Sequence, residues 1–139
     1  MSIKVSILVF KGDPLDYTKY RHTALFFEFP NGSTCTMHVE GAAGFFEFKT
    51  IDNYNPERSR SLTNKLIVAV LQDHISEEAI RGVVSRTPVK NTRQDMDWNC
   101  QNWVGDALAR MVNSGHLNAA QKASAIDRMT DACLDAVDE

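Results

Sequence analysis

Cysteine is scarce in this chain, and its scarcity argues against two kinds of site. The 139 residues include three cysteines, Cys35, Cys100 and Cys133, which form no CxxC pair. An odd number without paired spacing argues against a disulfide framework and against a thiolate zinc site. We therefore expect a reducing, cytoplasmic location. Cys35, on an expected strand, and Cys133, on the apolar face of an expected helix, are typical of small buried hydrophobic residues.

Charge of one sign and long apolar runs are also lacking. The formal net charge is −3, and no basic stripe runs along the chain, so we expect neither a nucleic-acid partner nor an anionic membrane surface. No apolar run approaches the length of a membrane span. The apolar residues 1–10 lack a small-residue cleavage site and run directly into Lys11-Gly12-Asp13-Pro14. They predict a strand rather than a signal peptide.

The histidines and acidic residues lack the spacing of a metal site. His22, His38, Asp95 and Asp97 could converge in space. None of them forms the helical i, i+4 pair, or the CxxC pair, that makes a metal assignment strong. We therefore expect no metal and no other cofactor.

The hydrophobic pattern predicts a single domain over residues 1–139, with strands first and helices afterwards. Apolar and β-branched runs, several ended by Gly, Pro or Asn, predict strands at 3–10, 21–29, 34–39, 45–51 and 65–71. Helical spacing behind polar caps predicts helices at 77–84, 100–113 and 118–137. This order indicates an α+β fold, in which an antiparallel sheet of about five strands packs against about three helices.

One cysteine stands where a thiol is activated most easily. Asn99 is a good N-cap, and Trp103 and later apolar residues follow at helical spacing, so Cys100 is expected at the start of a helix. Free backbone N–H groups and the helix dipole at that position favour thiolate over thiol. Cys100 is therefore the candidate nucleophile, and its own N–H could serve as half of an oxyanion hole.

A thiol nucleophile needs a base and a group that orients it. His22, at the start of a strand, is the candidate base, and His38 on the next strand is the candidate orienting group. A two-residue turn at Asn31-Gly32 would put the two histidines on opposite faces of the sheet, whereas an odd-length turn or a bulge would put them on one face. The sequence leaves both possibilities open. His74 and His116 stand near helix ends and are expected to be solvated or to cap those ends.

Three residues beside Cys100 are candidate substrate contacts. Trp98 is expected to line a cleft, and Asp97 and Gln101 are polar neighbours of the nucleophile. Acidic loop residues such as Asp97 are most often only solvated. Trp103, on the helix face, is expected in the core.

Two short motifs together resemble a known group of enzymes. His22-Thr23-Ala24-Leu25-Phe26-Phe27 opens a strand, His38 follows on the next one, and Asn99-Cys100-Gln101-Asn102-Trp103 opens a helix. This arrangement resembles the circularly permuted papain-like cysteine hydrolases, which include the lecithin:retinol acyltransferase-like enzymes and the PPPDE-like peptidases. The resemblance covers residues 3–114. Asn102 departs from it, because the relatives usually have a histidine before the aromatic residue.

The resemblance implies a permuted papain-like fold, with Cys100 as nucleophile and His22 as base. In the acyltransferase branch His38 would match a second histidine, whereas in the PPPDE branch it would be incidental. Many acyltransferase relatives carry a hydrophobic C-terminal anchor, and none is found here. The expected substrate is therefore an amide, isopeptide or thioester in a small molecule, peptide or protein. The alternatives are a catalytically silent domain that binds ligands near Trp98, and a lipid acyltransferase or phospholipase.

Overall fold

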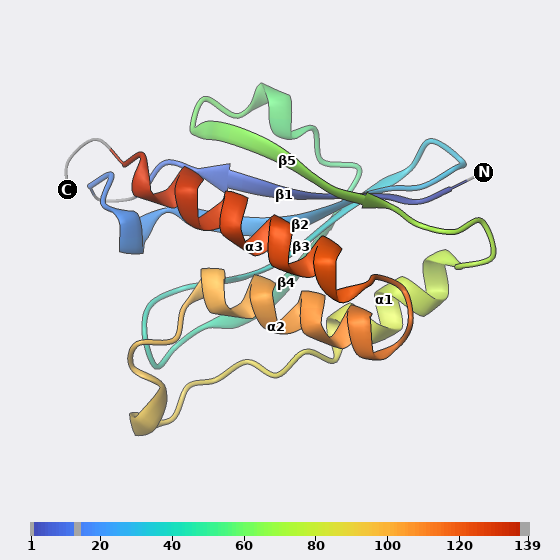
Figure 1. Ribbon diagram of the computed structural model, residues 1–139. Helices are drawn as coiled ribbons and strands as arrows, with labels where there is room; N and C mark the ends of the chain where they lie inside the picture. Colours follow the sequence, from blue (N-terminus) through green and yellow to red (C-terminus); the bar gives the residue numbers. More distant parts are fainter. Residues whose placement is uncertain (1, 13–14, 137–139) are drawn as a thin grey trace.

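The computed structural model describes residues 2–12 and 15–136, and its strands form one antiparallel sheet (Figure 1). The sheet order is β4-β3-β2-β1-β5. In chain order the strands are β1 (Lys4–Phe10), β2 (His22–Glu28), β3 (Thr34–Glu40), β4 (Glu47–Asp52) and β5 (Leu62–Val70). The helices that follow them are α1 (Glu77–Ser85), α2 (Cys100–Asn113) and α3 (Ala119–Leu134). Short 3-10 turns occur at η1 (Thr18–Tyr20), η2 (Pro56–Arg58) and η3 (Arg93–Asp95).

The α+β class, the five-stranded antiparallel sheet and the three helices agree with the prediction. The strand expected at 45–51 begins only at Glu47, because residues 41–46 form a turn with Gly41 and Gly44 at positive φ. The strand expected at 65–71 spans Leu62–Val70, since Leu62 and the polar Asn64 pair with β1. The last helix ends at Leu134, and residue 137, its expected end, lies outside the described residues.

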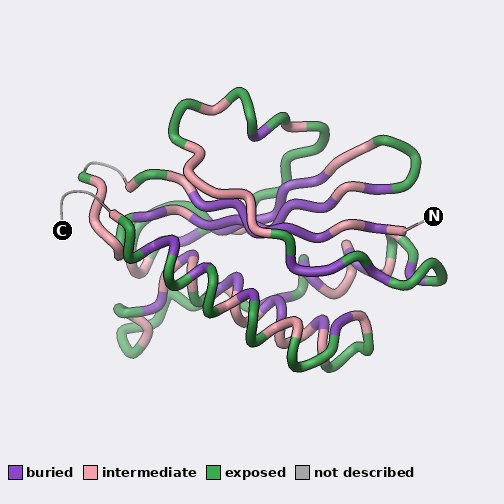
Figure 2. Tube along the Cα trace, turned by 45° about the horizontal axis from the view of Figure 1, so that its top comes forward, coloured by how far each residue is buried: buried purple, intermediate pink, exposed green. Residues whose placement is uncertain are grey.

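The alternation of side chains gives the sheet two unequal faces. The odd-numbered residues of β1, β2 and β3 point toward the helices and form the main core with them, including Ile7, Leu25, Phe27, Met37, Trp103, Leu108 and Met111. The even-numbered residues form a smaller cluster of Leu8, Ala24 and Phe26, with Phe10 and Leu62 packed against it. Figure 2 shows buried residues concentrated in the central strands and on the inner sides of the helices. Any side chain of β2 or β3 therefore belongs to one of two environments.

The turn between β2 and β3 settles which face holds each histidine. The Phe29 N–H donates to Ser33 O at 2.9 Å, and the Gly32 N–H donates to Phe29 O at 3.0 Å. The loop thus has three residues, 30–32, with Gly32 at a φ of +87°, which suits glycine. The resulting register pairs Leu25 with Met37. This odd-length turn places His22 and His38 on the same face, which is one of the two possibilities left open by the sequence.

Polar caps start all three helices. Ser76 accepts the Ala79 N–H at α1, and Asn99 and Asn118 form reciprocal capping boxes at α2 and α3. α2 packs on β2 and β3 and contacts both α1 and α3, while α3 packs mainly on β5 (Figure 1). Among the described residues, no helix is long and apolar enough to cross a membrane.

Candidate active site

The α2 helix begins at Cys100, as the sequence predicted. The Asn99 side-chain oxygen accepts the N–H groups of Gln101 at 2.9 Å and of Asn102 at 3.4 Å. The Asn102 side chain accepts the Asn99 N–H at 3.0 Å in return. Within the part of the chain that is described, the Cys100 N–H has the thiol of its own residue as its acceptor, and no backbone acceptor is found for it. This N–H can turn to a ligand at the helix end when the thiol reacts.

The surroundings of the Cys100 thiol raise its pKa, contrary to the sequence expectation of a lowered pKa. Cys100 is buried, and its Sγ donates to Arg21 O at 3.6 Å. Burial raises the pKa of the thiol, while N–H groups of Thr23, Cys100 and Gln101 and the Thr23 side chain lower it. The helix end thus acts in the predicted direction, but burial outweighs it.

The structure brings the two candidate histidines together. His22 Nε2 and His38 Nδ1 are 2.8 Å apart, and the rings meet edge to face. Burial, and then the neighbouring His38, lower the pKa of His22 to about 4. Burial also lowers the pKa of His38, which Glu40 raises and Lys49 lowers. Both imidazoles are neutral at pH 7. His38 Nε2 is buried and, among the described residues, has no hydrogen-bond partner.

Cys100 and His22 are not hydrogen-bonded to each other in the described part of the chain. Thr23 belongs to the face that α2 covers, whereas the His22 ring lies against Phe10 on the other side of the sheet, at a centroid distance of 5.7 Å. Both residues nevertheless line one cavity of about 610 Å³ at the end of the sheet. The proposed Cys–His pair stays a prediction.

Two of the three expected substrate contacts, Asp97 and Trp98, line this cavity. Trp98 is fixed: its Nε1 donates to Asp106 at 3.1 Å, and its ring meets Phe46 edge to face. Asp97 is exposed. Gln101 is not in the cavity lining, and its side-chain amide is bound to the backbone instead, as described below.

Most of the other residues that line the cavity were not predicted from the sequence. The turn at 41–43 contributes only small residues to the lining. Asn91 fixes the end of this turn through two hydrogen bonds with the Phe46 backbone: its side-chain oxygen accepts the Phe46 N–H at 2.8 Å, and its side-chain nitrogen donates to Phe46 O at 3.0 Å. The cluster Gly41-Ala42-Ala43-Gly44 predicted a bend in the chain, but it gave no sign that this bend lines a cavity. The other lining residues that the sequence did not single out are Lys19, Tyr20, Val39, Glu40, Phe46 and Met96, and the N-cap Asn99 also lines the cavity.

The mouth of the cavity is apolar in part. Tyr20 and Met96 line the cavity and are 40% and 55% exposed. Phe45, next to the lining residue Phe46, is 80% exposed. Large exposed apolar side chains gathered at one opening are typical of a binding surface. No group of three or more histidine, cysteine, aspartate or glutamate side chains placed to hold a metal is found among the residues described.

Comparison with known proteins gives a family but no activity. No curated protein and no solved structure matches the chain. A family model described as a family of unknown function (DUF6540) matches residues 10–118. The match includes the cavity residues and α2 but ends before α3. The chain therefore belongs to the family DUF6540.

Proposed function

We propose that this protein is a permuted papain-like cysteine hydrolase or acyltransferase acting on an amide, isopeptide or thioester. Cys100 Sγ attacks the acyl carbon, its proton passes to His22, and His22 then protonates the leaving group. The acyl-thioester is resolved by water or by an amine, which restores the thiol. His38 would orient His22 and hold the required tautomer.

The observation that carries the proposal is that one cavity is lined by both Cys100, at a helix N-terminus, and His22, which contacts His38 at 2.8 Å. The histidine pair matches a base and its orienting group. The Cys100 N–H, which among the described residues has no backbone acceptor, would stabilise an oxyanion formed at the helix end. Because thiol and imidazole are both neutral at rest, proton transfer would accompany the attack on the substrate rather than precede it.

Catalysis would require the Cys100 thiol and the His22 ring to leave the contacts that they make in the absence of substrate. The thiol must leave Arg21 O, and the His22 ring must turn toward it. Catalytic hydrogen bonds are often long or misaligned before substrate binds and tighten in the complex.

A second candidate is a catalytically silent binding domain. The buried neutral thiol and the lack of a Cys100–His22 hydrogen bond among the described residues favour it. The exposed apolar side chains of Tyr20 and Met96 in the cavity lining suit an apolar ligand in either case, and they are the feature that favours the lipid acyltransferase or phospholipase alternative.

Acyl transfer to the protein from an activated ester separates these candidates. The parent is mixed with p-nitrophenyl butyrate, quenched in acid and digested, and the acylated residue is located by mass spectrometry. We expect the butyryl group on Cys100. The His22→Ala variant should lose about 100-fold or more in acylation rate, because general base catalysis typically contributes that much. His38→Ala should lose less, since it acts through His22.

His74→Ala is the matched control, because His74 is exposed and lies outside the cavity lining. It should acylate at the parent rate. Equal acylation of the parent and His22→Ala, or no acylation of Cys100 at all, would contradict the proposal and leave the binding domain.

A further inference from the structure

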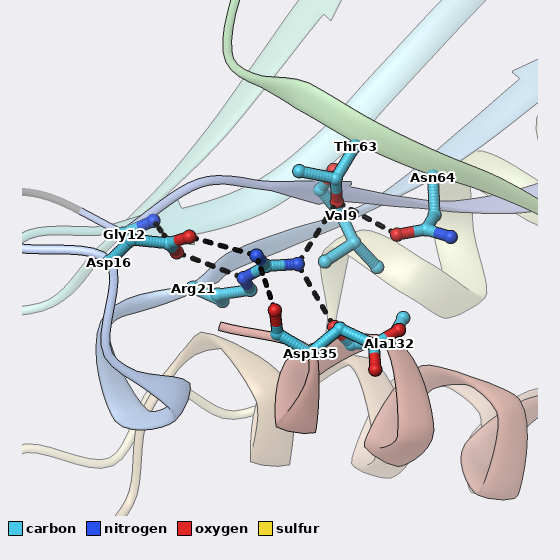
Figure 3. A network of polar contacts seen from close by, with 8 residues as sticks. All are labelled: Val9, Gly12, Asp16, Arg21, Thr63, Asn64, Ala132 and Asp135. Carbon is cyan, nitrogen blue, oxygen red and sulfur yellow. Dashed lines mark hydrogen bonds and ion pairs between the residues drawn. The ribbon is translucent and has the colours of Figure 1, made fainter. Parts of the chain in front are cut away.

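Arg21 is an arginine that is almost wholly buried, at 3% exposure, directly before His22. Its guanidinium pairs with both carboxylate oxygens of Asp16, at 2.9 and 2.8 Å. It also donates to Ala132 O at 3.0 Å and Asp135 O at 3.3 Å, at the C-terminal end of α3 (Figure 3). A weaker bond at 3.4 Å reaches the Thr63 hydroxyl on β5. One side chain thus ties three separate segments to the start of β2.

The backbone carbonyl of the same residue is the acceptor for the Cys100 thiol. It accepts Cys100 Sγ at 3.6 Å and the Gln101 side-chain amide at 3.1 Å. That amide also donates to Thr18 O at 2.8 Å, so it joins η1 to the first turn of α2. Arg21 therefore contacts α3 through its side chain and the thiol through its main chain.

We propose that Arg21 is a positioning residue through which the C-terminal end of α3 holds the Cys100 thiol in its neutral, unreactive form. A hydrogen bond donated by the thiol stabilises the protonated state, so loosening the carbonyl favours the thiolate. The guanidinium fixes the carbonyl only while its fork reaches Asp16 and the two α3 carbonyls together. Movement of the α3 end would then release the thiol.

Few charged or titratable side chains lie near the Cys100 thiol among the described residues. Cys133 on α3 is its titratable neighbour, and the Arg21 guanidinium acts on Cys133 in turn. His22 lies across the sheet, and Lys19, Glu40 and Asp97 line the cavity. The family match includes Asp16, Arg21 and Cys100 but ends at residue 118, before α3. The inference extends the proposed function, because it concerns the same thiol.

The test replaces Arg21 by lysine, which keeps the positive charge but cannot span all of its acceptors. Iodoacetamide alkylation of Cys100, Cys35 and Cys133 is followed in the folded protein by mass spectrometry between pH 6 and pH 9. In Arg21→Lys we expect Cys100 to alkylate about tenfold faster at pH 7, with its pH profile shifted about one unit downward. Cys35 should keep its parent rate. Asp16→Asn, which weakens the anchor of the same guanidinium, should give a smaller shift of the same sign.

Arg81→Lys is the matched control, because the Arg81 guanidinium bridges Glu77 and Asp52 and donates to Cys35 Sγ at 3.5 Å, away from the cavity. It should change Cys35 and leave Cys100 at the parent rate. An unchanged Cys100 profile in Arg21→Lys, or an equal acceleration of Cys35 and Cys100, would overturn the proposal, since the second result indicates general loosening. The acylation assay with p-nitrophenyl butyrate separates the two ideas: if His22→Ala is acylated at the parent rate while Cys100 alkylation still responds to Arg21→Lys, the enzymatic proposal fails and the positioning role stands.

Discussion

At the scale of single residues, the histidine pair makes stability depend on pH. The folded-state pKa of His22 is lowered to about 4, below the ordinary value of 6.5, so the unfolded chain binds its proton first as pH falls. The contribution of this pKa shift to the unfolding free energy is complete above about pH 6.5 and is lost progressively as the pH falls from 6.5 to 4. From the shift we expect a loss of about 2 kcal/mol between pH 7 and pH 5, measured by urea unfolding.

The substitution that removes this titration gives the test. His22→Gln should show a flatter dependence of unfolding free energy on pH over that window, even if it is less stable at pH 7. His74→Gln, at an exposed position, should keep the parent slope. Equal slopes in the parent and in His22→Gln would show that the pair is not buried as described. Glu40 and Lys49, which act on the pKa of His38 in opposite directions, are unchanged in both variants.

At the scale of elements, two helix starts provide a matched pair. Asn99 and Asn118 form the same capping box, at α2 beside the cavity and at α3 on an exposed corner. Asn99→Ala and Asn118→Ala should each lower the unfolding free energy by about 1 kcal/mol. Only Asn99→Ala should also speed Cys100 alkylation, because fraying of the first turn exposes the thiol. Faster alkylation of Cys100 in both variants would mean that stability alone governs it.

The sequence predicted the features that depend on neighbours along the chain. Asn99 before an apolar helical pattern was enough to place Cys100 at a helix start. Whether His38 and His22 share a face depended on whether Pro30 belongs to the turn. Local propensity does not decide this, whereas the hydrogen bond from the Phe29 N–H to Ser33 O in the structure does. The partner of the thiol could not be predicted, because Arg21 O reaches Cys100 only through the packing of η1 against α2.

The state of the thiol shows the same limit. The helix end was predictable from sequence, and it lowers the pKa as expected, but the burial that raises it comes from the whole core. Likewise, the buried Arg21 carries no pattern beyond an acidic residue five positions earlier, and its α3 acceptors lie more than 100 positions away in the chain. Tertiary contacts thus decided the chemistry of a site whose residues were locally recognisable.

At the scale of the whole molecule, the two edges of the sheet differ in how they are covered. α3 packs along β5, and Arg128 donates to Ile67 O at 2.7 Å (Figure 1). β4, at the opposite edge, is exposed at every residue except Phe48, which is half-buried. β1 and β2 lie between other strands and are buried through their centres.

This asymmetry predicts an order of amide hydrogen exchange in the native protein. Opening free energies range from near zero at exposed edges to the global value in the core, so peptides from β1 and β2 should exchange slowest and those from β4 fastest. β5 should fall between them, since it is also an edge strand but carries a helix. Exchange followed by mass spectrometry at pH 7 gives the order directly, and the comparison of β4 with β5 serves as an internal control because both edges belong to one sheet. If β4 were protected as strongly as β5, another surface would have to cover that edge in solution, and a concentration series would then show whether a second copy of the chain supplies it.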